Sequence, residues 1–211
     1  MPKIFICSLI FFSLLISSCS TSTPPPVPEV VSVYSTSSTT PWLTEAYACA
    51  GTSTVLSRVD NPSDADISLR VGEPGLLSSF AYQIDTEEIL IVTHRQSPVQ
   101  NLTLDEARMV FMQGNPSVQV WVYASGEDVQ QVFGQSVMEG RNVVSSAKVA
   151  VDPQQMADVL VNESNTIGIL PRHWKVGDAR EVFSVATVPV LALTNSEPEG
   201  VVKELISCLQ K

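Results

Sequence analysis

Two polar turns in this chain carry the side chains best suited to binding an anion. The first is a hydroxyl run from Ser35 to Thr40, and the second is the segment Ser125–Asp128. Each turn follows an apolar, strand-like segment and opens a helical pattern, where free backbone N–H groups and the helix dipole favour a negative ligand group. The candidate ligand contacts are therefore Ser37, Ser38, Thr39, Thr40, Ser125, Gly126, Glu127 and Asp128.

Arg70 is the third candidate contact. It lies near the end of a predicted strand and before a Gly/Pro loop, at 72–75. An alternative is a surface ion pair with Asp66 or Glu73. The hydroxyl run also has a simpler interpretation, because Thr40 before Pro41 is a favourable helix start and the run could only cap that helix and solvate a loop.

The elements that must position these side chains alternate between strand and helix. Ile89–Val92 is an unbroken apolar run, which is typical of a strand covered on both faces. Thr103 and Glu106 form a capping box, and the helix they start ends at Gly114. The segment Val118–Tyr123 predicts the next strand. This alternation predicts an α/β fold.

Other segments extend the same pattern. Strands are predicted at 30–34, 56–59, 66–70, 167–170 and 188–193, and the apolar segment 143–151 is strand-like at its end. Helices are predicted at 41–50, 128–133, 152–161 and 199–209.

The order of these motifs resembles the phosphate-type solute-binding proteins of ABC importers, in the type II periplasmic binding protein superfamily. The resemblance runs from about Val30 to the carboxyl terminus, and its motifs include Asn101–Glu106, Val110–Gly114 and Ser125–Gly126. It implies a two-lobed fold in which each lobe is a small sheet flanked by helices, with an oxyanion held between them by hydroxyls, helix N-termini and an arginine. The implied lobes are residues 30–93 with 186–211, and residues 94–185.

The second polar turn departs from that family. Where the family has Ser-Gly-Thr followed by Arg, this chain has Glu127 and Asp128 after Ser125 and Gly126. Two carboxylates there would repel a dianion a few ångströms away. An alternative function is therefore a surface lipoprotein that retains the fold and acts as a scaffold or protein-interaction module without oxyanion binding.

The amino terminus predicts export and lipid anchoring. Lys3 precedes an apolar run, Ile4 to Ile16, too short to span a bilayer, and the ending at Cys19 resembles the bacterial lipobox. We expect a signal peptide at 1–18, a diacylglycerol (palmitate) anchor on Cys19 and a Ser/Thr/Pro-rich tether at 19–29. The alternative is an ordinary signal or a buried anchor. The expected location is the bacterial envelope, on the outer side of the cytoplasmic membrane.

Cys49 and Cys208 remain after the signal and the lipidated cysteine are set aside. They fall in the first and last predicted helices, which the resemblance assigns to one lobe. An oxidising compartment favours a disulfide between them, and the alternative is two buried free thiols.

The composition argues against other function classes. With 22 acidic and 12 basic residues the net charge is −10, which does not suit nucleic acid as a partner. His94 and His173 lack second metal ligands at suitable spacing, and no Walker A, dinucleotide or Gly-x-Ser-x-Gly motif is present. We expect a non-enzymatic protein without metal or cofactor, whose partners are a small anionic solute, a membrane permease and the lipid bilayer.

Overall fold

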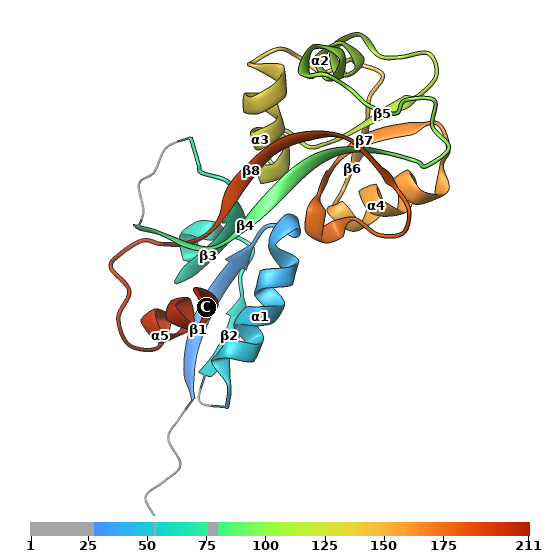
Figure 1. Cartoon of the computed structure of the whole chain (residues 1–211). Helices are drawn as coiled ribbons and strands as arrows, with labels where there is room; N and C mark the ends of the chain where they lie inside the picture. Colours follow the sequence, from blue (N-terminus) through green and yellow to red (C-terminus); the bar gives the residue numbers. More distant parts are fainter. Residues whose placement is uncertain (1–27, 53, 76–79) are drawn as a thin grey trace, which may run out of the picture.

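One mixed eight-stranded sheet organises the described part of the chain, residues 28–52, 54–75 and 80–211 of a computed structural model. Its strand order is β2-β1-β3-β8-β4-β7-β5-β6, and helices flank it in both halves of the molecule (Figure 1). The predicted α/β class is confirmed. The predicted signal peptide, Cys19 and most of the tether lie outside the described residues.

The elements alternate along the chain much as the sequence pattern indicates. The strands are β1 (Glu29–Ser35), β2 (Thr54–Arg58), β3 (Ile67–Val71), β4 (Phe80–Thr93), β5 (Gln119–Tyr123), β6 (Lys148–Ala150), β7 (Thr166–Pro171) and β8 (Arg180–Thr194). The α-helices are α1 (Thr40–Ala50), α2 (Leu104–Gln113), α3 (Asp128–Phe133), α4 (Pro153–Asn162) and α5 (Gly200–Leu209). Single turns are η1 (Ser37–Thr39), η2 (Pro62–Asp64), the π-helical η3 (Gly134–Met138) and η4 (Arg172–Trp174).

The long antiparallel strands β4 and β8 carry the sheet from one half of the molecule to the other (Figure 1). β3 pairs with β8 only as far as Val190, and β7 pairs with β4 only from Ile89 onward. Between these points, at 86–88 of β4 and 187–189 of β8, the sheet is two strands wide. This narrow stretch separates a first half, with β1, β2, β3, α1 and α5, from a second half with β5, β6, β7, α2, α3 and α4.

The core is built from the apolar runs seen in the sequence. Ile89–Val92 of β4 is fully buried, as expected for a strand covered on both faces. In the second half, the rings of Phe111 in α2 and Phe133 in α3 lie 4.7 Å apart at their centroids. In the first half, Trp42 of α1 and Ile206 of α5 are buried in the same continuous cluster.

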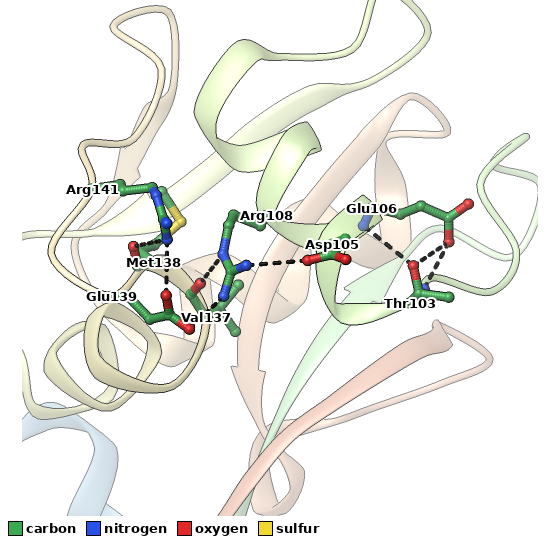
Figure 2. Close-up of polar contacts among 8 residues, drawn as sticks. All are labelled: Thr103, Asp105, Glu106, Arg108, Val137, Met138, Glu139 and Arg141. Atoms are coloured by element: carbon green, nitrogen blue, oxygen red, sulfur yellow. Dashed lines mark hydrogen bonds and ion pairs between the residues drawn. The ribbon is translucent and has the colours of Figure 1, made fainter.

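A polar network fixes α2 against the end of η3 and the Glu139 that follows it (Figure 2). The predicted capping box is present, because the Thr103 hydroxyl accepts from the Glu106 N–H and the Glu106 carboxylate accepts from the Thr103 N–H. One turn later, Arg108 donates from Nε to the carbonyl oxygen of Val137 at 2.8 Å and pairs with Glu139 at 2.7 Å. In the second half, α2 is therefore held by side-chain hydrogen bonds and ion pairs as well as by apolar packing.

A disulfide joins Cys49 in α1 to Cys208 in α5, with the two Cα atoms 6.0 Å apart. The predicted pairing is confirmed, and the free-thiol alternative does not apply. Because both helices pack in the first half, the bond ties the end of the chain to its first helix.

Candidate ligand cleft

The hydroxyl turn leaves the sheet at the carboxyl end of β1. β1 runs parallel to β3, with Ser35 opposite Leu69, so the turn lies beside Arg70 and Val71 at the end of β3. The Thr36 N–H donates to the Leu69 carbonyl oxygen at 3.3 Å and anchors the turn there. Ligands of open α/β sheets usually bind at such carboxyl edges.

The second polar turn approaches from the other half of the molecule. It follows β5, and α3 begins at Asp128. Asp128 is only 2% exposed, and its Oδ2 accepts from the Thr36 hydroxyl at 2.7 Å and from the Val71 N–H at 2.8 Å. The Glu127 carboxylate accepts from the Ser37 hydroxyl at 3.0 Å. The two turns that the sequence singled out therefore meet across the halves.

The predicted ligand contacts occupy different positions where the two turns meet. Ser37, Glu127 and Asp128 contact across this junction, whereas Ser125 and Gly126 are exposed at its rim. The Thr39 hydroxyl is buried and bonds within its own turn and to the Leu69 carbonyl oxygen. The remaining two are Ser38, whose carbonyl oxygen accepts from Trp174 Nε1, and Thr40, whose hydroxyl donates to the Ser37 carbonyl oxygen.

Thr36 is the hydroxyl that the sequence reasoning missed as a contact, although it belongs to the same run. The side chains do not act as simple helix caps, because neither Thr36 before η1 nor Thr39 before α1 makes a side-chain capping bond. Thr36 instead donates its hydroxyl to Asp128. The capping interpretation of the run therefore fails for these two residues.

Arg70 connects the same two halves. It donates from Nε to the Gly72 carbonyl oxygen at 3.0 Å and from a terminal nitrogen to Gln131 Oε1 in α3 at 3.2 Å. The alternative ion pair with Asp66 or Glu73 is not among the ion pairs of the described residues. Burial lowers the pKa of the Arg70 guanidinium, while Asp128 acts in the opposite sense. An arginine side chain stays protonated even when its pKa is lowered, so Arg70 could bind an anion.

Gly72 lets the first half approach α3 closely. Its φ is +75°, and a Cβ built there would lie 2.7 Å from Cγ2 of Val132. A side chain at this position would push α3 away from β3.

The site carries more negative than positive charge where the two turns meet. Burial raises the pKa of Tyr34, and the carboxylates of Glu127 and Asp128 raise it further, while Arg70 opposes them. Two carboxylates therefore face one guanidinium.

A second polar cluster lies at the narrow part of the sheet. Glu87 of β4 is 1% exposed and contacts His173 Nδ1 at 2.9 Å. The His173 ring packs on Trp42 of α1, with centroids 4.7 Å apart, and Trp42 Nε1 donates to Asp85 at 2.9 Å. An open cavity of about 390 Å³ is lined here by Thr86, Glu87, Glu88, Arg172, His173 and Thr187. No sequence pattern marks Glu87 as buried.

Glu87 should make the stability of the protein depend on pH. Burial raises its pKa above the ordinary value of 4.5, against the opposing effect of His173. The folded state thus holds this proton more tightly than the unfolded state, so the contribution is stabilising at acid pH and is lost as pH rises through the folded pKa. We expect Glu87→Gln to gain stability relative to the wild type as pH rises above the ordinary carboxyl pKa of 4.5, measured by urea unfolding.

Glu88→Gln is the matched control for this prediction. Hydrogen bonds from Arg172 and then Ser184 lower the pKa of Glu88, so its contribution is present at neutral pH and is lost as pH falls. The two variants should therefore differ from the wild type with opposite pH slopes. Parallel curves for Glu87→Gln and the wild type would contradict the prediction.

Among residues 28–52, 54–75 and 80–211, no group of three or more His, Cys, Asp or Glu side chains is placed to hold a metal ion. In the same part of the chain, no helix combines the length and apolar character needed to cross a membrane.

Comparison with solved structures decides the fold. No protein-family model and no curated protein matches the chain. A putative phosphate ABC transporter substrate-binding protein from Clostridium perfringens, with bound phosphate, aligns over 86% of this chain and 93% of its own, with a TM-score of 0.74 and 14% identity. An ABC-type phosphate transport receptor from Vibrio cholerae covers the same shares, with a TM-score of 0.64 and 13% identity. The chain has the type II periplasmic binding protein fold.

The same fold also occurs outside transport. The regulatory domain of OxyR2 from Vibrio vulnificus aligns over 87% of this chain and 97% of its own, with a TM-score of 0.60 and 9% identity. At these identities the likeness is one of fold, so function must be argued from the cleft itself.

Proposed function

We propose that this chain is an extracytoplasmic solute-binding protein, tethered through a lipidated Cys19, that captures a small phosphate-like oxyanion for an ABC importer. The observation that carries the proposal is the meeting of the two polar turns at the carboxyl edge of the sheet. The Thr36 hydroxyl, the Val71 N–H and the nearby Arg70 supply donors of the kind that tetrahedral oxyanions need. The fold shared with two phosphate-transport proteins supports the same function.

The proposed mechanism is closure about the narrow part of the sheet. The moving units would be the predicted lobes, residues 30–93 with 186–211 and residues 94–185, and the hinge would be the two-stranded stretch at 86–88 and 187–189. Residues 89–93 of β4, which pair with β7, would therefore move with the second lobe. Each unit supplies one wall, and the solute stabilises the closed state through contacts that the open state lacks. Ser37, Ser125, Gly126 and Arg70 would complete the wall, and the protein would bind without chemical conversion.

A second candidate function is favoured by the two carboxylates of the cleft. Glu127 and Asp128 accept bonds from hydroxyls of the opposite turn, so the donors are already engaged. In this second function the lipoprotein keeps the fold as a scaffold or protein-interaction module, which does not require donors free to bind an oxyanion.

A thermal-shift screen of the chain from Val27 onward separates the two functions. Phosphate, sulfate, molybdate, phosphonates and neutral sugars would be compared at fixed ionic strength. A ligand at 100 times its dissociation constant adds about 2.7 kcal/mol, a shift of several degrees for a protein of this size.

The variant that tests the cleft is Thr36→Val, which keeps the side-chain shape but removes the donor. Thr44→Val is its control, because the exposed Thr44 bonds only within α1. A shift from one oxyanion that Thr36→Val weakens and Thr44→Val retains supports the importer function. No shift from any compound, with the protein folded, would favour the interaction module.

A further inference from the structure

Asp128 is an unusual carboxylate because it is buried without a cation. It is 2% exposed, and its two oxygens accept from three donors: the Thr36 hydroxyl, the Val71 N–H and the Val129 N–H, at 2.7, 2.8 and 2.8 Å. The ion pairs of the described residues do not include Asp128. Neutral donors therefore compensate its negative charge.

Two of those donors reach Asp128 from the opposite half of the molecule. Thr36 and Val71 lie at the carboxyl ends of β1 and β3 in the first half, whereas Asp128 begins α3 in the second. The residues are 92 and 57 positions away from Asp128 in the sequence. A hydroxyl and a backbone N–H that converge on one buried carboxylate oxygen are a typical arrangement for holding an anionic group.

Arg70 lies close to this carboxylate but does not neutralise it by a direct bond. Its guanidinium donates to the Gly72 carbonyl oxygen and to Gln131. The anion held between the halves is therefore the Asp128 carboxylate of the protein itself. Within the described part of the chain, the nearby Arg70 guanidinium bonds only to neutral groups.

We propose that Asp128 is the resident anion of the cleft: its carboxylate occupies the Thr36 and Val71 donors, clasps the two halves together without a solute, and must be displaced by any oxyanion that binds there. This inference rests on the proposed function for its ligand but not for the clasp itself. A competitor built into the chain lowers apparent affinity, because only the fraction of molecules with a displaced carboxylate can bind. Asp128 thereby sets how tightly the cleft takes an oxyanion.

The clasp has a readout that needs no ligand. In the mature lipidated chain held in detergent, hydrogen exchange of the peptide containing the Val71 amide reports the bond to Asp128. We expect Asp128→Ala to accelerate that exchange at least about tenfold, because the acceptor is gone and the halves separate more often. Asp158→Ala removes the same charge from an exposed site on α4 and should leave the exchange unchanged.

The second readout is the affinity for inorganic phosphate, measured by calorimetry on the same proteins. Asp128→Ala should bind phosphate about tenfold or more tightly than the wild type, since donors are freed and a like charge is removed. Asp128→Asn keeps the side-chain size, so it guards against a folding defect in the alanine variant and should lie between the two.

The outcomes distinguish the clasp from the proposed function. Faster Val71 exchange with no phosphate binding in any variant would support the clasp and reject phosphate as the solute. Unchanged exchange with equal phosphate affinity in the wild type, Asp128→Asn and Asp128→Ala would overturn the clasp and leave the binding function standing.

Discussion

Replacing Cys49 and Cys208 together by alanine is expected to lower the free energy of unfolding by up to about 5 kcal/mol. The bond links residues 159 positions apart, so it restricts nearly the whole unfolded domain. Chain entropy accounts for most of this loss, because the bond closes a long loop in the unfolded state. Guanidinium unfolding of the double variant and the wild type measures the difference.

Reduction of the wild type provides an independent control for that result. A thiol reductant present throughout unfolding should lower the wild-type midpoint toward that of the double variant and leave the variant unchanged. The variant should also retain the contacts of the cleft, since both cysteines lie on helices away from it. Equal stability of oxidised wild type and double variant would show that the bond does not stabilise the fold.

The sequence patterns that predicted structure correctly depend only on residues close together in the chain. The Thr103–Glu106 capping box depends on residues three apart, and Ile89–Val92 is apolar enough to require burial on both faces. The crossing strands were underestimated because, outside their apolar runs, they mix exposed with buried residues. β4 begins at Phe80, well before that apolar run, and there the exposed Gln83 and Asp85 lie on either side of the buried Ile84.

The segment at 143–151 was predicted to be strand-like at its end, and β6 lies there. β6 covers Lys148–Ala150 at the edge of the sheet, where Val149 and Val151 are exposed. Apolar side chains indicate burial only where another layer covers them. Nothing within the segment shows that its outer face lacks such a layer.

The candidate site could be located from the sequence, but its internal bonding could not. Hydroxyl and carboxylate turns at strand ends indicate a shared edge, and Ser37 does meet Glu127. The burial of Asp128 under Thr36 and Val71 depends on how two distant halves close, which no local pattern encodes. Glu87 is a similar case, because its partner His173 is 86 positions away.

Truncating Trp42 to alanine is expected to cost about 3–5 kcal/mol of unfolding free energy. The ring is 1% exposed in the first-half core, so its removal leaves a large cavity. Its Nε1 also donates to Asp85, and its face packs on His173 of the opposite half. The loss would be measured by urea unfolding, with the m-value checking that the transition remains cooperative.

Two further variants separate the contributions of Trp42. Trp42→Phe keeps an aromatic ring but loses the donor to Asp85, so we expect a smaller loss, about 1–2 kcal/mol. A double-mutant cycle with His173→Ala isolates the ring contact across the halves, for which about 0.5–1.5 kcal/mol is expected. A coupling of zero would mean that Trp42 stabilises the first half alone. A clear coupling would mean that the halves are held together at the narrow part of the sheet as well as at Asp128, so that opening the cleft must break both contacts.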